Sequence, residues 1–372
     1  MSGRRILITG GAGFIGSHLA DHLLAHGHAV RALDVLSPQV HGPGAARPAY
    51  LAREVELQVG DVRDPEAVRR ALRGVDAVVH LAAAVGVGQS MYEVERYVGV
   101  NDLGTATLLQ ALIERPVERL VVASSMSLYG EGLYRDARGR PVTAERTRAQ
   151  LLARRWEPAG EGGAALEPVP TPETKPPALA SIYALSKYDQ ERMSLLVGEA
   201  YGIATVALRF FNVYGTRQAL SNPYTGVLAI FAARYLNGRP PLVNEDGVQR
   251  RDFVSVRDVA EACRLALTVP GAAGQVLNVG SGRSFTVLEV AERLAVALGR
   301  EELRPEVTQR YRVGDIRHCF ADISRARAVL GYAPAVAFDD GLAELAGWLE
   351  GQIAHDRVGE ASAELAARGL SL

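Results

Sequence analysis

A glycine-rich turn near the N-terminus constrains the fold of this chain more than any other feature. Residues 10–16 read Gly-Gly-Ala-Gly-Phe-Ile-Gly; an apolar run, Ile6 to Thr9, precedes them, and an amphipathic segment, Phe14 to Ala25, continues from them. Glycine permits a tight turn, close approach of the backbone to a ligand and close packing of a helix on a strand. Unpaired N–H groups at the start of the helix favour an anion. This combination predicts a dinucleotide-binding α/β unit with a group of residues around the pyrophosphate: Gly10, Gly13, Phe14, Ile15 and Gly16.

An acidic residue follows the turn at the distance that such a unit requires. Asp34 ends a second predicted strand, Ala29 to Leu33, and no arginine comes directly after it. A carboxylate there accepts hydrogen bonds from the adenosine ribose and repels a 2′-phosphate, which favours NAD over NADP. The alternative is that Asp34 only caps a turn. Asp61 and Val62, after the third predicted strand, are placed to touch the adenine.

Strand and helix signals keep alternating through the first half of the chain. Further strands are expected at residues 55–59, 77–81 and 120–123, and helices at 65–72 and 93–113. This order predicts an α/β fold with a Rossmann-type, doubly wound parallel sheet over residues 1–210. A smaller, mainly substrate-binding lobe is expected over residues 211–372, with some segments returning to the first domain. Residues 131–177, rich in Gly, Pro, Arg and Glu, are an insertion that either orders partly over the active site or forms a solvated surface loop.

A tyrosine and a lysine four residues apart are the expected chemical centre. Tyr183 and Lys187 share one face of a predicted helix. A phenol has a pKa of about 10, so its use as a base near neutral pH needs roughly 4 kcal/mol of phenolate stabilisation. The Lys187 ammonium and a positive nicotinamide ring would both supply it, and a lysine also bonds ribose hydroxyls in a way that arginine does not reproduce. Lys187 and Lys175 are the only lysines of an arginine-rich chain, which supports a specific role for Lys187.

Two serines end the strand that begins at Leu120. Ser124 and Ser125 lie at its carboxyl end, where ligands bind in open α/β sheets. A hydroxyl there can donate a hydrogen bond to the substrate oxygen that becomes a carbonyl. The alternative is that the serines only cap the strand.

Composition and charge exclude several other classes of protein. The net charge of −1 gives no general attraction to nucleic acid or to an anionic membrane, and no apolar run reaches the roughly 18 residues that span a bilayer. Cys263 and Cys319 are far apart, so neither a disulfide framework nor a zinc site is expected, and without a signal-like N-terminus the expected location is cytoplasmic. His18, His22 and His26 repeat at helical spacing; no acidic third ligand is expected to accompany them, and no metal site is predicted.

Together these motifs resemble the extended short-chain dehydrogenase/reductase family. The resemblance runs through nearly the whole chain, in the turn at residues 10–16, Asp34, Gly60-Asp61-Val62, His80 to Ala83, Ser125, Tyr129-Gly130, Tyr183 with Lys187, Arg209 to Gly215, Arg251 to Val254 and Asn278 to Gly280. Within the family the chain is similar to the NAD-dependent nucleotide-sugar epimerases and dehydratases. Residues 83–90 and 221–227 are most similar to the dTDP-L-rhamnose 4-epimerases.

The resemblance implies roles for single residues. Tyr183 would be the general base, Lys187 its electrostatic helper and Ser125 the hydrogen-bond donor to the sugar hydroxyl. NAD would also be held by Leu81, Ala82, Ala83, Asn101, Ser124, Phe210 and Phe211. The substrate would also contact Val85, Ser127, Asn212, Val227, Arg251, Arg312 and Asp315. The two arginines suit a diphosphate because guanidinium binds phosphate oxygens bidentately.

Two departures from the family pattern narrow the expected reaction. The 4,6-dehydratases carry an Asp-Glu pair where this chain has Met126 and Ser127, so water elimination would lack its acid and base. Galactose epimerases of the family commonly carry lysine at the position of Val85, which argues against UDP-glucose. A 4-epimerase is therefore expected, acting on a dTDP-6-deoxyhexose such as dTDP-L-rhamnose, with dTDP-6-deoxy-L-talose as product.

The expected mechanism is transient oxidation at C4 of the sugar with bound NAD⁺. The alternatives are a net NAD(P)-dependent 4-ketoreductase or dehydrogenase, a UDP-hexose 4-epimerase and, remotely, a non-catalytic NAD sensor. Relatives commonly pair two helices from each subunit, which implies a homodimer through helix 93–113 and the Tyr183 helix.

Overall fold

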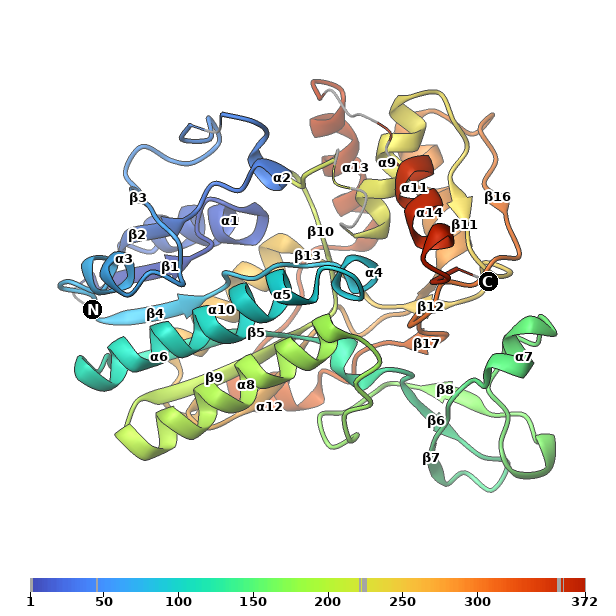
Figure 1. Ribbon diagram of the computed structural model, residues 1–372, viewed down its shortest axis with the longest axis horizontal. Coiled ribbons are helices and arrows are strands. Elements are labelled where there is room, and N and C mark those ends of the chain that lie inside the picture. Colours follow the sequence, from blue (N-terminus) through green and yellow to red (C-terminus); the bar gives the residue numbers. More distant parts are fainter. Residues whose placement is uncertain are drawn as a thin grey trace.

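A parallel seven-stranded sheet forms the centre of the molecule (Figure 1). The computed structural model describes residues 3–44, 46–220, 222, 226–352, 356 and 358–371. The sheet strands are β1 Arg5–Thr9, β2 Ala29–Asp34, β3 Glu56–Val59, β4 Ala77–His80, β5 Arg119–Ser125, β9 Ala204–Phe210 and β14 Val276–Val279. They are ordered β14-β9-β5-β4-β1-β2-β3, and every neighbouring pair is parallel. The Rossmann-type fold expected from the sequence is confirmed.

Helices cover both faces of this sheet, which explains why its central strands are apolar along their length. On one face α1 Phe14–Ala25 packs against α10 Val256–Thr268, with α12 Ser324–Leu330 beside them. On the other face lie α3 Pro65–Ala71, α6 Gly104–Glu114 and α8 Ile182–Tyr201. Side chains of β1 alternate between the two cores, with Ile6 and Ile8 in the first and Leu7 in the second.

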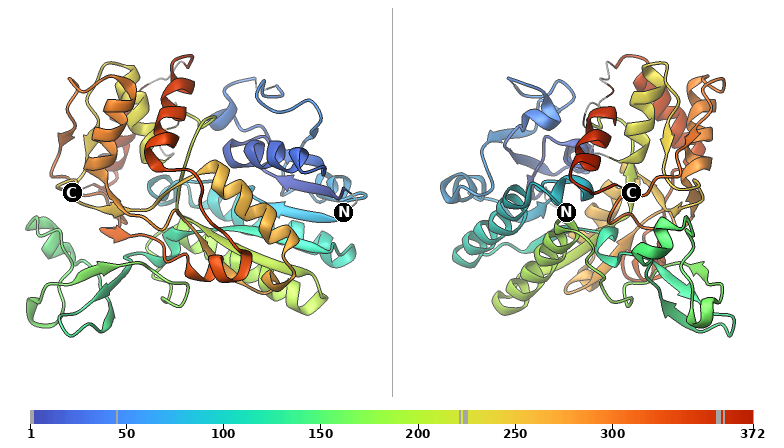
Figure 2. Two further views of the ribbon diagram at one scale, coloured as in Figure 1. Left: turned by 180° about the vertical axis from the view of Figure 1, so that it is seen from behind. Right: turned by 45° about the vertical axis from the view of Figure 1, so that its right-hand side comes forward.

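The helix expected over residues 93–113 contains a π-helical segment. It consists of α5 Val94–Tyr97, the π-helix Val98–Leu103 and α6. A π-helix adds a residue to the turn, is rare and frequently lies at a functional site. The segment lies beside α8 in all three views (Figures 1 and 2).

A smaller lobe with its own core follows the sheet strand β9. Its helices are α9 Val227–Leu236, α11 Val287–Leu298 and α13 Phe338–Leu349, and α14 Val358–Ala367 lies near the C-terminus. Its short strands pair as β10 Asn212–Tyr214 with β13 Phe253–Ser255, β11 Leu242–Val243 with β16 Glu306–Val307, and β12 Arg250–Arg251 with both β15 Phe285–Thr286 and β17 His318–Cys319. Residues of α10, β14 and α12 belong instead to the core around the sheet. The division at residue 210 stays a prediction.

The insertion at residues 131–177 is folded. Its strands β6 Leu133–Arg135, β7 Pro141–Thr143 and β8 Glu167–Val169 form an antiparallel sheet in the order β7-β6-β8. The short helix α7 Arg148–Leu152 lies between β7 and β8 in the chain. Tyr134, Leu151 and Trp156 are buried. The insertion lies at one end of the molecule, beside β17 (Figure 1). The expectation of a solvated loop is therefore wrong, because these residues pair and bury their own side chains.

The remaining short elements are α2 Pro38–His41, α4 Val87–Ser90 and the 3₁₀ turns Met126–Tyr129, Glu161–Gly163 and Pro270–Ala272. Among the described residues, no helix has the length and apolar character needed to cross a bilayer. Both cysteines are buried and free.

Candidate active site

A cavity of about 1170 Å³ opens at the carboxyl ends of the parallel strands, between the sheet and the smaller lobe. Its walls contain most of the residues predicted from the sequence: Gly10, Gly13, Phe14, Ile15, Gly16, Asp34, Asp61, Val62, Leu81, Ala82, Ala83, Val85, Ser124, Ser125, Tyr183, Lys187, Phe210, Phe211, Asn212 and Val227. No residue of the insertion is part of this wall within the described chain. The expectation that the insertion orders over the active site stays a prediction.

The glycine-rich turn has the geometry that a pyrophosphate needs. Gly10 has φ of +69°, which favours glycine. A Cβ on Gly16 would lie 2.3 Å from the Gly10 carbonyl oxygen, so this glycine lets α1 pack on the turn. A Cβ on Gly13 would meet only the Gly10 oxygen at 3.4 Å, and Gly13 lines the cavity at the start of α1. The turn therefore leaves space beside the N-terminus of α1, where the helix favours an anion.

The Asp34 carboxylate both caps the turn and lines the cavity. Its Oδ2 accepts a hydrogen bond from Ala12 N (3.0 Å) and its Oδ1 one from Leu36 N (2.9 Å). Because a carboxylate has about four acceptor sites, capacity remains for ribose hydroxyls. Asp61 is held by the Arg63 guanidinium, whose hydrogen bonds keep the pKa of Asp61 below its usual value. The ribose and adenine roles of Asp34 and Asp61 stay predictions.

Tyr183 and Lys187 lie together in the cavity wall on α8. Ser181 caps this helix by accepting a hydrogen bond from Ala184 N (3.1 Å), and Ser90 of α4 accepts one from Tyr183 N (3.0 Å). Burial raises the pKa of Tyr183, and hydrogen bonding from Ser125 acts against that rise. Burial also lowers the pKa of Lys187 to about 7, against the charge of Glu191. Burial therefore works against a phenolate on Tyr183, and the hydrogen bond from Ser125 works in its favour.

Three hydroxyls form a relay toward the reacting position. Ser127 donates from N (3.1 Å) and from Oγ (2.9 Å) to Ser125 Oγ, and the Ser125 hydroxyl hydrogen-bonds Tyr183. Ser124 Oγ donates to Glu191 Oε2 (2.7 Å), which also binds Arg209. Ser125 also caps the turn at Met126–Tyr129, and its role as donor to the substrate stays a prediction. Ser127 does not line the cavity, and it contacts the hydroxyl of Ser125 where contact with the substrate was expected.

Gln190 is a site residue that the sequence reasoning missed. Its Oε1 accepts a hydrogen bond from Lys187 Nζ (2.8 Å), and its Nε2 donates to Thr105 Oγ1 (2.8 Å) and lies 3.2 Å from His80 Nε2. Burial lowers the pKa of His80 to about 3, so this imidazole is neutral. An ammonium has three N–H donors, and among the described residues Lys187 uses one of them. The others remain for ribose hydroxyls. The sequence feature that could have indicated this contact is the position of Gln190, three residues after Lys187 on the same helix.

Asn101 lies behind the cavity wall, where direct cofactor contact was expected. Its Oδ1 accepts a hydrogen bond from Ala84 N (2.7 Å), and its Nδ2 donates to Ala84 O (3.1 Å) and Ser186 Oγ (2.9 Å). It is fully buried in the π-helical segment and is not part of the wall. Asn101 therefore ties the loop after β4 to α8.

Arg251, Arg312 and Asp315 meet in the smaller lobe but lie outside the cavity wall. Asp315 Oδ1 is 3.3 Å from Arg312 Nη2 and 3.7 Å from Arg251 Nη2. Burial alone would raise the pKa of Asp315, but the neighbouring guanidinium groups hold it below its usual value. The three residues therefore form one polar cluster, and their role as contacts of the diphosphate stays a prediction.

An acidic residue lies beside His22 and His26, which corrects the reason given against a metal site there. Glu261 of α10 lies 2.7 Å from His22 Nε2, and the ligand atoms of His22, His26 and Glu261 all lie within 4.8 Å of one another. An acidic residue thus does accompany the histidines, although it is distant in sequence. The Arg264 guanidinium binds both Glu261 oxygens, at 2.7 and 2.6 Å, and opposes a cation there.

Comparison with known proteins places the chain in a family. The model of the NAD-dependent epimerase/dehydratase family matches residues 6–152 and 158–280. The chain belongs to this family. Its membership confirms the expectations of an enzyme, of NAD as cofactor and of an extended short-chain dehydrogenase/reductase type of protein.

Individual members of the family match the chain over nearly its full length. A dTDP-L-rhamnose 4-epimerase from Burkholderia thailandensis is 36% identical over 358 residues, 94% of this chain and 96% of its own length. A UDP-glucose 4-epimerase from Mycolicibacterium smegmatis is 34% identical and covers 91% of this chain and 96% of its own length. The solved structure of the Thermus thermophilus UDP-glucose 4-epimerase in complex with NAD is 33% identical, with a TM-score of 0.74 over 94% of this chain and 100% of that one.

Part of the motif at residues 221–227 lies outside the described residues. Ser221, Pro223, Tyr224 and Thr225 belong to that part. Asn222, Gly226 and Val227 line the cavity.

Proposed function

We propose that this protein is a nucleotide-sugar 4-epimerase that acts on a dTDP-6-deoxyhexose, such as dTDP-L-rhamnose, and produces the C4 epimer, such as dTDP-6-deoxy-L-talose. The observation that carries the proposal is the group formed by Tyr183, Lys187 and Ser125 in the wall of the cavity that begins at the glycine-rich turn. The relative from Burkholderia thailandensis is named for the same reaction type and substrate.

The residues present fit an NAD molecule. Gly10 and Gly13 would leave room for the pyrophosphate, Asp34 in the same cavity wall would face the adenosine end, and Lys187 would hold the nicotinamide ribose with its remaining donors. Bound NAD⁺ would supply a reversible hydride acceptor for C4 of the sugar. It would also supply the positive charge that favours the Tyr183 phenolate.

The protein side chains then have defined tasks. Tyr183 removes the proton of the C4 hydroxyl and returns it after the ketone has turned in the cavity. Ser125 donates a hydrogen bond to the C4 oxygen, and Ser127 orients Ser125. Asn212 and Val227 contact the substrate from the lobe side, and Arg251, Arg312 and Asp315 hold its nucleoside diphosphate. The two departures from the family pattern also support this choice. Met126 and Ser127 give no acid–base pair for dehydration, and Val85 takes the position of the lysine of galactose epimerases.

The decisive test is interconversion without added cofactor. Purified protein is incubated with dTDP-L-rhamnose, UDP-glucose or UDP-galactose, and the products are followed by NMR. A C4 epimer of the dTDP sugar at equilibrium is expected, with no net change in NADH absorbance. Stoichiometric consumption of NAD(P)H would identify a ketoreductase instead, and turnover of the UDP sugars alone would reassign the substrate.

Tyr183→Phe provides the matched variant. A loss of about 10³-fold in kcat is expected because the proton acceptor is removed, whereas Tyr201→Phe, at the exposed end of α8, keeps wild-type activity. NAD binding by the Tyr183→Phe protein should persist. Full activity in this variant would contradict the proposal, and an NAD sensor would show no turnover in either protein.

We also propose a homodimer and a cytoplasmic location. The α5 to α6 helix and α8 lie side by side and expose apolar side chains, among them Val98, Leu103, Leu185 and Leu196. Two such helices from each of two copies would cover these side chains in a four-helix arrangement.

A further inference from the structure

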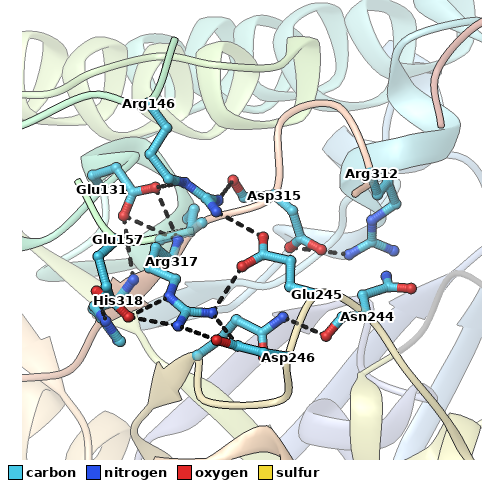
Figure 3. A network of polar contacts seen from close by, with 12 residues as sticks. Glu131, Arg146, Glu157, Asn244, Glu245, Asp246, Arg312, Asp315, Arg317 and His318 are labelled. Atoms are coloured by element: carbon cyan, nitrogen blue, oxygen red, sulfur yellow. Dashed lines mark hydrogen bonds and ion pairs between the residues drawn. The ribbon is translucent and has the colours of Figure 1, made fainter. Parts of the chain in front are cut away.

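The insertion at residues 131–177 holds the loop that carries Arg312 and Asp315. We propose that it is a positioning element for the nucleoside diphosphate of the substrate, acting through residues 315–318. This inference rests on the proposed function, because it takes Arg251, Arg312 and Asp315 as the groups that bind the diphosphate. Figure 3 shows the polar network that joins the insertion to this loop.

Glu131, the first residue of the insertion, binds the backbone of the loop. Its carboxylate accepts hydrogen bonds from Arg317 N (2.9 and 3.0 Å) and His318 N (3.2 Å). The Tyr134 hydroxyl donates to the same carboxylate (3.0 Å). The insertion backbone adds pairs at both of its ends, from Gly132 N to His318 O (2.7 Å) and from Thr171 N to Phe320 O (2.8 Å).

Arg146 joins three separate segments with one guanidinium group. It donates to Glu131 Oε1 (2.9 Å), to Glu245 Oε1 (2.7 Å) and to the backbone oxygen of Asp315 (2.9 Å). Its side chain is only 2% exposed. The guanidinium also lies 5.2 Å from the centre of the Tyr311 ring. This direct bond joins an insertion residue to the backbone of Asp315, which is itself a proposed substrate contact.

Glu157 holds the same loop through Arg317. One oxygen of Glu157 accepts from Arg317 Nε (2.9 Å) and Nη2 (2.5 Å), and the other lies 2.9 Å from His318 Nε2. Arg317 is 1% exposed and also binds Glu245 (2.9 Å) and Asp246 (2.6 and 2.9 Å). Arg317 is thus fixed from the insertion on one side and from the β11–β12 loop on the other (Figure 3).

The backbone at the facing loop is strained, which indicates that the surrounding contacts determine its position. Glu245 has φ of +51° and Gln309 has φ of +56°. The two residues are joined by a hydrogen bond from Gln309 N to Glu245 O (3.1 Å). Glu245 is fully buried and binds both Arg146 and Arg317.

The orientation of Arg251 depends on the same loop. Its guanidinium donates to the backbone oxygens of Ile316 and Arg317, the latter at 3.0 Å. A shift of residues 315–318 would therefore move Arg251 and Asp315 together, and Arg312 with them. Buried ion pairs add little net stability, so their use here is consistent with fixing a geometry. Among the described residues, Ser125 and Lys187 bond to Ser127 and Gln190 and not to members of this network.

Arg146→Met tests the proposal because it removes the bond to Asp315 O without adding a charge. Binding of dTDP, and of UDP in parallel, is measured by calorimetry, together with NAD⁺ binding and the KM and kcat for the nucleotide sugar. The expected result is about 10-fold weaker dTDP binding and a similar rise in KM, with kcat within about threefold and NAD⁺ affinity unchanged. Arg146→Lys should recover part of the affinity. Arg140→Met is the control, because Arg140 pairs with Asp136 inside the same insertion and is exposed.

Glu157→Gln is the second variant, since the Glu157 side chain is half exposed and tolerates exchange more readily than buried Arg146. Weaker dTDP binding at unchanged NAD⁺ affinity is again expected. Wild-type dTDP affinity in both variants, while Arg312→Ala loses it, would overturn the positioning role and leave the proposed function intact. If Arg312→Ala also binds dTDP and UDP normally, the substrate site of the proposed function is itself wrong, and the inference falls with it.

Discussion

Lys187 is a buried lysine whose charged form is disfavoured by its surroundings. Lys187 is 4% exposed, its Nζ donates to Gln190, and burial lowers its pKa to about 7. Its normal pKa is about 10.4 in an unfolded chain. Between these two values the unfolded state binds more protons than the folded state, so the free energy of unfolding rises with pH over this window. The protein thus keeps a lysine at a position where its burial lowers the stability of the fold but where its side chain serves the reaction.

Lys187→Met should therefore stabilise the protein without cofactor and inactivate it. We expect the free energy of unfolding of the variant at pH 7.5 to exceed that of the wild-type protein by about 1 kcal/mol or more. Between pH 7 and 10 the free energy of unfolding should rise less in the variant than in the wild-type protein. Activity should fall by at least about 10²-fold, because the variant loses the Nζ donors that remain for the nicotinamide ribose hydroxyls. Urea unfolding at several pH values and the epimerase assay measure both effects. Arg192→Met, exposed on the same helix, is the control; a Lys187→Met protein that is less stable at pH 7.5 would contradict the argument.

At the residue scale, the sequence predicted where the site residues lie better than it predicted their hydrogen-bond partners. Tyr183, Lys187 and Ser125 come together because helical spacing and the parallel sheet determine their places. The relay through Ser127 and the support from Gln190 were not predicted, since they depend on side-chain orientations that a single sequence does not encode. The same limit applies to Glu261, which is remote in sequence from His22 but close in space.

The π-helical segment between α5 and α6 shows what an element adds to the site. It directs Asn101 inward, where the side-chain amide binds both backbone groups of Ala84 and the Ser186 hydroxyl. Helical periodicity alone predicts a continuous α-helix over this segment, because one extra residue per turn leaves no sequence signal. The loop after β4, which lines the cavity with Leu81, Ala82 and Ala83, is thereby fixed to α8.

Asn101→Leu should damage both stability and catalysis. The change leaves the N–H and C=O of Ala84 without partners in a buried place, which costs about 2–3 kcal/mol. We expect kcat/KM to fall by about 10- to 100-fold as the loop after β4 shifts from α8. Chemical unfolding and initial rates measure the two effects. Thr107→Ala on α6, whose hydroxyl bonds the carbonyl of Leu103, should leave both near wild type, and an equally small effect of Asn101→Leu would show that the anchor is unimportant.

At the scale of the whole molecule, the exposed apolar side chains of α5 to α8 indicate a second copy. Leu103 and Leu196 are each 56% exposed. The double variant Leu103→Asp, Leu196→Asp should convert the proposed dimer to a monomer, because charges in an apolar interface are costly. Sedimentation velocity measures the change. Leu152→Asp, at a 61% exposed position in the insertion, is the control; a wild-type protein that sediments as a monomer would refute the dimer.

The overall architecture could be predicted from the sequence to a different degree in each part. The sheet followed from strictly alternating strands and helices, and the structure confirms it. The insertion was not predictable as a folded unit, because its strands are three residues long and lack periodicity. Its contacts join residues that are up to 187 positions apart, such as Glu131 and His318. Such contacts depend on the finished fold.

The double use of Asp34 has a consequence for how coenzyme preference can evolve. The carboxylate that would discriminate against a 2′-phosphate also accepts hydrogen bonds from Ala12 N in the phosphate-binding turn and from Leu36 N in the following loop. Replacing it by a neutral side chain to admit NADP would therefore loosen the turn that every dinucleotide needs. A lineage of this enzyme has to acquire a new anchor for residue 12 before, or together with, a change of coenzyme.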